Sequence, residues 1–135
     1  MTDCLFCSIA QHQIPAEIVY EDDATLAFLD IHPRSLGHTV VIPKLHVDNL
    51  VQLPEVAIAP LFLTLRRVTD MISRSLHPDG FTIGINQGSV SGQAIAHLHV
   101  HIIPRFVGDG GGSIHSAVDN PPKEALAATA IKIRG

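Results

Sequence analysis

The chain has 135 residues, of which 46% are hydrophobic and 16% are charged, and its formal net charge is −4. This length predicts one domain spanning residues 1–135, and the composition excludes a disordered chain. The negative charge argues against binding along extended nucleic acid, and no apolar run approaches the roughly 20 residues of a membrane span. We therefore expect a cytoplasmic globular protein, for which a single nucleotide is a possible ligand.

The amino-terminal third contains a cysteine pair followed by three short β-like runs. Cys4 and Cys7 are the only cysteines, and their C-x-x-C spacing in a reducing compartment indicates a metal or redox role more than a structural disulfide. Residues 18–21, 25–29 and 38–42 each favour a strand, and the turn residues "EDD" and "HPRSLG" separate them. These runs predict an antiparallel meander.

The rest of the chain predicts one main helix, two more strands and a carboxyl-terminal helix. Apolar residues recur every three or four positions over 56–76, where Pro60 indicates either a kink or the true start of the helix. Alternating patterns follow at 81–88 and 97–105, and 120–134 combines alanines with a proline-marked start. The expected fold class is α+β, with a five-stranded antiparallel sheet, one main helix and a carboxyl-terminal segment.

The stretch "HLHVHIIPR" places His97, His99 and His101 at alternate positions. In a strand these imidazoles share one face, and the apolar residues between them share the other. Three interpretations compete for the histidine face. It is a solvated surface, or a zinc site in which an H-x-H pair meets one ion, or a catalytic site in which one imidazole attacks a phosphate that its neighbours position.

The stretch "NQGSVSGQAIAHLHVHIIPR" resembles the signature of the histidine triad (HIT) family, whose motif is His-x-His-x-His followed by two apolar residues and here occupies residues 97–103. The start "DCLFC" and the later "IPKLH" resemble the Hint branch of that family, and the similarity spans most of residues 3–106. The resemblance implies a HIT-like fold and a two-fold homodimer in which helices pack and the sheets continue across the interface.

The resemblance also implies an activity and assigns the three histidines. Hint proteins act at the α-phosphorus of nucleotides, which makes His99 the nucleophile and His101 a stabiliser of transition-state charge, with His97 completing the triad. An imidazole with a pKa near 6.5 is largely neutral at pH 7, and the nitrogen–phosphorus bond that it forms is labile to water. A transient nucleotidyl-histidine is therefore expected.

Two further groups of residues match family positions that surround the substrate. The phosphate-binding group is Asn86, Gly92, Gln93 and Ala94 with His99 and His101, and the nucleoside-binding group is Phe6, Ile9, Phe28, Asp30 and Ile31. Several relatives carry a hydroxyl residue at the position of Ala94, which has no side-chain donor. On the residues alone, ordinary loop polarity is the favoured interpretation of Asn86 and Gln93, and core packing is the favoured interpretation of the phenylalanines.

The family also includes members with a Cys₂His₂ zinc site, and Cys4, Cys7, His46 and His97 match its ligands. Four protein ligands leave no open coordination position, so the implied zinc is structural and none is required for catalysis. Spacing alone does not connect these four residues, because the histidines are far from the cysteines in the sequence. Two buried free thiols are the alternative interpretation.

The expected function is hydrolysis of purine nucleoside phosphoramidates or adenylyl conjugates, which releases the nucleoside monophosphate. One alternative is a dinucleoside polyphosphate hydrolase of the same superfamily. Another is a nucleotide-binding scaffold protein with vestigial catalysis. The comparison that separates them is turnover of an adenosine phosphoramidate and of a diadenosine polyphosphate by one preparation.

Overall fold

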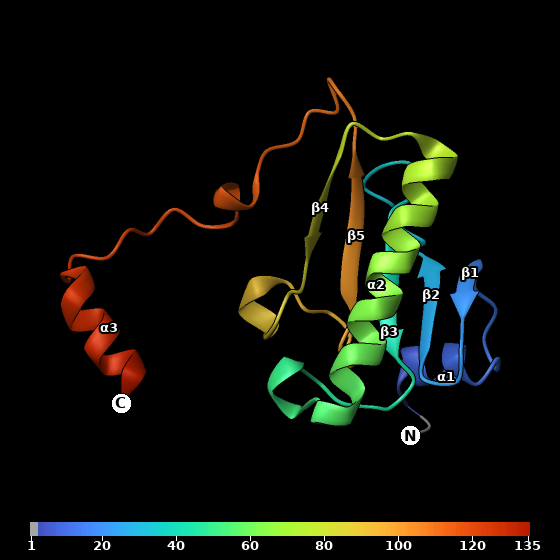
Figure 1. Ribbon diagram of the computed structural model, residues 1–135, viewed down its shortest axis with the longest axis horizontal. Helices are drawn as coiled ribbons and strands as arrows, with labels where there is room; N and C mark the ends of the chain where they lie inside the picture. Colours follow the sequence, from blue (N-terminus) through green and yellow to red (C-terminus); the bar gives the residue numbers. More distant parts are fainter. Residues whose placement is uncertain (1–2) are drawn as a thin grey trace.

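The computed structural model describes residues 3–135 and contains one five-stranded antiparallel sheet with the strand order β1-β2-β3-β5-β4 (Figure 1). The strands are β1 (Ile18–Glu21), β2 (Thr25–Leu29), β3 (Thr39–Pro43), β4 (Gly80–Gly84) and β5 (Val100–Arg105). The predicted α+β class and the five-stranded antiparallel sheet are confirmed. The first two strands have the predicted bounds, and the third lies one residue further along the chain than predicted.

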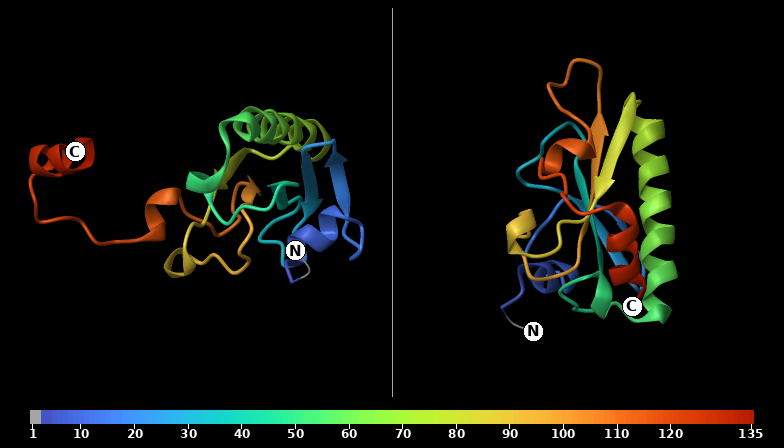
Figure 2. Two further views of the ribbon diagram at one scale, coloured as in Figure 1. Left: turned by 90° about the horizontal axis from the view of Figure 1, so that it is seen from below. Right: turned by 90° about the vertical axis from the view of Figure 1, so that its left-hand side faces the viewer.

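Helices cover both faces of the sheet (Figure 2). The long helix α2 (Glu55–Leu76) lies on one face and the short helix α1 (Leu5–Ala10) lies on the other, while α3 (Leu126–Arg134) stands apart. Within residues 3–135, no helix is long and apolar enough to cross a membrane.

Helix α2 begins at Glu55 and continues through Pro60, so the helix does not start at that proline. Its apolar stripe packs on the sheet, so the predicted helical periodicity corresponds to a real core face. This core contains Leu61, Leu65, Val68 and Ile72 from the helix and Leu98, Val100 and Ile102 from the histidine segment.

The opposite face of the sheet carries a second core, built around α1 and composed of Cys4, Phe6, Cys7, Ile9, Leu26, Phe28, Val40 and Ile42. The sequence analysis did not predict α1, because six residues are too few to show a helical period. Leu98 and Val100 pack toward α2, while His97 and His99 contact Phe6 in α1. The two cores therefore separate the apolar residues from the histidines, as the alternation predicted.

Two strands are shorter than predicted. Strand β5 begins at Val100 rather than at residue 97, because the Leu98 backbone N–H donates to Val47 O at 2.7 Å instead of to a neighbouring strand. His97 and His99 therefore precede the strand, and only His101 belongs to it. Strand β4 ends at Gly84, and the loop that follows it contains Asn86 and Gln93.

Candidate functional site

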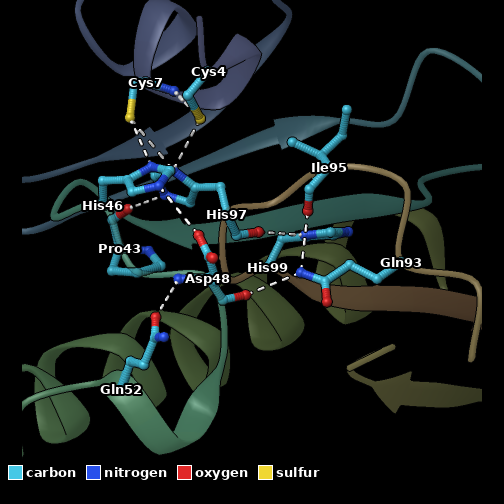
Figure 3. Close-up of polar contacts among 10 residues, drawn as sticks. All are labelled: Cys4, Cys7, Pro43, His46, Asp48, Gln52, Gln93, Ile95, His97 and His99. Atoms are coloured by element: carbon cyan, nitrogen blue, oxygen red, sulfur yellow. Dashed lines mark hydrogen bonds and ion pairs between the residues drawn. The ribbon is translucent and has the colours of Figure 1, made fainter. Parts of the chain in front are cut away.

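The cysteine pair meets two histidines from distant parts of the chain (Figure 3). His97 Nδ1 lies 3.4 Å from Cys4 Sγ and 3.5 Å from Cys7 Sγ, and His46 Nδ1 lies 3.2 Å from both Cys7 Sγ and His97 Nδ1. A tetrahedral ion with ligand bonds of about 2.0–2.3 Å holds its ligand atoms roughly 3.3–3.8 Å apart. The four predicted metal ligands are thus together, at spacings suited to one ion.

Hydrogen bonds around this cluster orient both imidazoles as metal ligands. His97 Nε2 lies 2.8 Å from Pro43 O, so it carries the proton and leaves a lone pair on Nδ1. His46 Nε2 lies 3.3 Å from the Asp48 carboxylate, which favours the same tautomer. Two lone pairs facing each other at 3.2 Å repel unless a cation lies between them. This arrangement fits a bound metal ion.

The thiols of the cluster are buried at the start of α1. Cys4 is the amino-terminal cap of that helix, and its sulfur accepts a hydrogen bond from the Cys7 backbone N–H at 3.4 Å. Burial, with a further contribution from Cys4, raises the pKa of Cys7 to about 11. The Cys7 thiol therefore stays protonated at neutral pH unless a cation displaces its proton.

His99 lies beside this cluster but belongs to a different set of contacts. Its Nδ1 donates to His97 O at 2.7 Å, which fixes the proton on Nδ1 and leaves a lone pair on Nε2. The Phe6 ring meets the His99 ring edge to face, with centroids 5.1 Å apart, and meets the His97 ring at 6.0 Å. Phe6 therefore connects the metal cluster with the candidate nucleophile.

His101 has the opposite tautomer, because a chain of hydrogen bonds ends on its Nδ1. The Arg34 backbone N–H donates to His38 Nδ1 at 3.0 Å, so the His38 proton is on Nε2. His38 Nε2 in turn donates to His101 Nδ1 at 2.9 Å, which places the His101 proton on Nε2. The His99 and His101 rings lie 5.0 Å apart, and they present a lone pair and an N–H donor respectively.

His101 is uncharged at neutral pH in the free protein. Burial, and then the nearby His99 and His38, lower its pKa to about 4. Burial also lowers the pKa of His38. The Asp30 carboxylate lies 3.5 Å from His38 Nε2 and 3.9 Å from His101 Nδ1, so it partly offsets this effect. The pair therefore offers a neutral N–H donor rather than a fixed positive charge.

The loop between β4 and β5 holds the predicted phosphate group. The Gln93 side chain is bonded within the protein, since its Nε2 donates to Asp48 O at 2.9 Å and to Ile95 O at 3.1 Å. Gly92 has φ of +102°, and its neighbour Asn86 is exposed, as is Ala94. Gln93 thus orders the loop, while the backbone at Gly92 and Ala94 remains open to a ligand.

The predicted nucleoside group divides into buried and exposed members. Phe6, Ile9 and Phe28 belong to the core around α1, and the Phe6 and Phe28 rings meet edge to face at 5.4 Å. Asp30 follows β2 directly, and its Oδ1 accepts the His32 backbone N–H at 2.8 Å. Ile31 is 82% exposed and does not join this core. Core packing and a ligand surface are both compatible with the two phenylalanines.

His38 is the site residue that the sequence analysis missed. We assigned it only to the third strand, although it is 4% exposed and bonded to His101. Gly37, with φ of +86°, lets the chain pass close to α2, because a Cβ there would lie 2.5 Å from Leu76 Cδ1. A lone histidine that opens an apolar strand, as in "GHTVVIP", was the available signal.

Comparisons with known proteins agree on one family. The family whose model matches the sequence is described as "HIT domain", over residues 11–108. The HIT-like protein MJ0866 of Methanocaldococcus jannaschii is 43% identical over 79% of this chain and 82% of its own length. The protein named adenylylsulfatase HINT3, from Arabidopsis thaliana, is 39% identical over 76% of this chain but only 52% of its own length.

Solved structures that resemble this chain are described as members of the same family. A HIT family protein from Bacillus subtilis superposes with a TM-score of 0.87 and 34% identity, over 98% of this chain and 95% of that one. A histidine triad family protein from Mycobacterium smegmatis, described as zinc-bound, superposes with a TM-score of 0.75 and 38% identity, over 81% of this chain and 79% of that one. Family model, sequence relatives and structures together show that this chain belongs to the histidine triad (HIT) family.

Proposed function

We propose that the protein hydrolyses purine nucleoside phosphoramidates or related adenylyl conjugates at the α-phosphorus. One observation carries this proposal: neighbouring imidazoles of opposite tautomer, His99 with a free lone pair and His101 with an N–H donor. A phosphorus centre under attack needs a nucleophile and a donor to a nonbridging oxygen, and this pair supplies both. The named activity of the Arabidopsis relative, an adenylylsulfatase, supports an adenylyl conjugate as substrate.

The reaction proceeds in two displacements. His99 Nε2 attacks the α-phosphorus and the bond from phosphorus to the leaving group breaks. An amine leaving group takes up a proton from solvent, whereas sulfate leaves as the anion. Water then attacks the same phosphorus, the nitrogen–phosphorus bond breaks, and the nucleoside monophosphate leaves. The His97 carbonyl stabilises the His99 ring while it carries positive charge, because it accepts the Nδ1–H throughout. His101 donates to the phosphoryl oxygen in both steps.

Residues around this pair bind the rest of the nucleotide. Asp30 accepts hydrogen bonds from the ribose hydroxyls, and Phe6 and Phe28 form the apolar side of the base site with Ile9 and exposed Ile31. The backbone at Gly92 and Ala94 approaches the phosphate, and exposed Asn86 adds a side-chain amide. Gln93 positions this loop through its bonds to Asp48 O and Ile95 O.

A turnover comparison on one preparation tests this proposal. We expect kcat/KM for an adenosine phosphoramidate or for adenylyl sulfate to exceed that for a diadenosine polyphosphate by at least about tenfold, and the product to be AMP. The reverse order would favour the dinucleoside polyphosphate hydrolase. AMP binding without turnover of any of the three would favour a scaffold protein with vestigial catalysis.

We also propose that Cys4, Cys7, His46 and His97 hold one zinc ion with a structural role. The donor set, the spacing of the four atoms and the zinc-bound relative support this assignment. The ion would join α1 to the segment before β5, and the chemistry would remain with His99 and His101. Ligand cysteines of this kind need a reducing compartment, so we place the protein in the cytoplasm.

His38 positions the catalytic donor, and its removal should lower kcat more than it raises KM. In His38→Ala, His101 Nδ1 loses its donor, so the His101 proton is free to occupy either ring nitrogen. We expect kcat to fall about 10–100-fold, because part of the population lacks the N–H directed at phosphate. Steady-state kinetics with an adenosine phosphoramidate measure this change.

The matched variant is His38→Gln, whose amide can still donate to His101 Nδ1. It should recover at least part of the lost kcat, whereas a merely space-filling role would be restored equally by His38→Leu. Equal kinetics for the Ala, Gln and Leu variants would contradict the positioning role.

A further inference from the structure

The cysteine pair at the start of α1 lies close enough to close into a disulfide. Cys4 caps the helix and Cys7 lies three residues further on, so their Cα atoms are about 5 Å apart, the helical spacing of i and i+3. Disulfides span Cα separations of roughly 4.4–6.8 Å. The two sulfurs also face one point, since His97 Nδ1 lies 3.4 Å from Cys4 Sγ and 3.5 Å from Cys7 Sγ (Figure 3). Rotation of the two side chains therefore brings the sulfurs together without movement of the backbone.

Both thiols are free, and they lie just below the surface of the protein. Cys4 is 8% exposed and Cys7 is 5% exposed, while the side chain of His46, which lies 3.2 Å from Cys7 Sγ, is 25% exposed. His46 is thus the outermost member of the cluster. A small oxidant such as hydrogen peroxide reaches sulfurs at this depth, whereas a thiol of another protein does not.

The two cysteines have different surroundings, which assign them different roles in an oxidation. The backbone N–H of Cys7 donates to Cys4 Sγ at 3.4 Å, and this donor stabilises negative charge on the Cys4 sulfur. The thiolate is the form of cysteine that attacks an oxidant, and both cysteines are thiolates when they bind a metal ion. Cys4 is therefore the attacking sulfur, and Cys7 is the partner that closes the disulfide.

We propose that Cys4 and Cys7 form a reversible oxidation site at which hydrogen peroxide produces a disulfide and releases the zinc ion. Cys4 Sγ attacks one peroxide oxygen, the O–O bond breaks, and hydroxide leaves a sulfenic acid on Cys4. Cys7 Sγ then attacks Cys4 Sγ, the S–O bond breaks, and a second hydroxide leaves as the S–S bond forms. The cysteines lose two electrons, peroxide gains them, and two protons convert both hydroxides into water. This inference uses the metal site proposed above and does not depend on the proposed catalytic activity.

The disulfide changes how α1 is attached to the rest of the protein. It joins two residues of one helix, whereas the four-ligand cluster joins α1 to His46 and His97. A ring of so few residues constrains the unfolded chain far less than a bridge to residue 97, so the oxidised protein is less stable than the zinc form. Phe6 stands between the two cysteines, and its ring lies 5.1 Å from that of His99. Oxidation therefore also loosens a contact of the candidate nucleophile.

Titration of the zinc-loaded protein with hydrogen peroxide tests this site. We expect one zinc ion to reach a colorimetric chelator for every two thiols that are lost, and Tm to fall to the value of the chelated protein. Cleavage after Arg34 gives a peptide, residues 1–34, that contains both cysteines and should be lighter by two hydrogen atoms in mass spectrometry. A thiol reductant with added zinc should restore the thiols, the metal and Tm.

Two variants provide the controls. Cys7→Ser leaves Cys4 without its partner, so excess peroxide should produce a sulfinic acid that the reductant does not reverse. Met71→Leu removes the only other sulfur-containing side chain within residues 3–135 and should release zinc as the wild type does. A disulfide that forms in protein without zinc would support the oxidation site and reject the metal assignment. Sulfinic acid in the wild type, a disulfide between two chains, or unchanged thiols after peroxide treatment would each overturn the proposal.

Discussion

His99→Ala should abolish turnover of an adenosine phosphoramidate while the protein stays folded and still binds AMP. The variant removes the only imidazole of the pair that presents a free lone pair, whereas the contact between Phe6 and His97 and the His38–His101 pair remain. Loss of a covalent nucleophile costs at least about 10³-fold in kcat. Single-turnover kinetics, together with calorimetric binding of AMP, measure both effects.

Two controls connect this loss to the missing nitrogen. His99→Gly leaves a space, and added imidazole should restore part of the turnover. His115→Ala removes an exposed imidazole beyond β5 and should leave kcat unchanged. When the wild type reacts briefly with substrate and the reaction is then quenched, a nucleotide should be found attached to residue 99. Near-normal kcat in His99→Ala would eliminate the covalent mechanism.

Loss of the metal should destabilise the protein strongly and reduce turnover without abolishing it. We expect about one zinc per chain by elemental analysis, and its loss in Cys4→Ser. Because the site joins α1 to the segment before β5, the free energy of unfolding should fall by about 3 kcal/mol, or roughly 6–12 °C in Tm. Phe6 contacts both His97 and His99, so a looser α1 should lower kcat/KM several-fold.

A pair of histidine variants separates the metal from general surface effects. His46→Asn removes a ligand and should lose zinc, whereas His12→Asn changes an exposed histidine that pairs with Glu21 and should keep it. An unchanged Tm after chelation would rule the site out. Complete loss of turnover in a folded, chelated protein would instead support a metal-dependent hydrolase.

The sequence by itself determined strands β1 and β2, the long helix α2 and the separation of the histidines from the apolar residues, but it did not predict α1 or the bounds of β4 and β5. Strands β1 and β2 have the predicted bounds because charged turn residues at 22–23 interrupt two apolar runs. Helix α2 follows from a long period of three and four residues. Leu98, Val100 and Ile102 alternate with the three histidines, and this period placed the two groups in opposite directions.

Only the tertiary structure decided what each imidazole can do. The tautomers of His97, His99 and His101 depend on hydrogen bonds to Pro43 O, His97 O and the His38 ring, respectively. Pro43 is 54 residues from His97 in the sequence, and His38 is 63 residues from His101, so only folding brings these partners together. Folding also brings together Cys4 and His97, which are 93 residues apart in the sequence. A local pattern carries no information on such contacts. An imidazole acts as a ligand, a nucleophile or a donor according to which of its nitrogens the surrounding structure protonates.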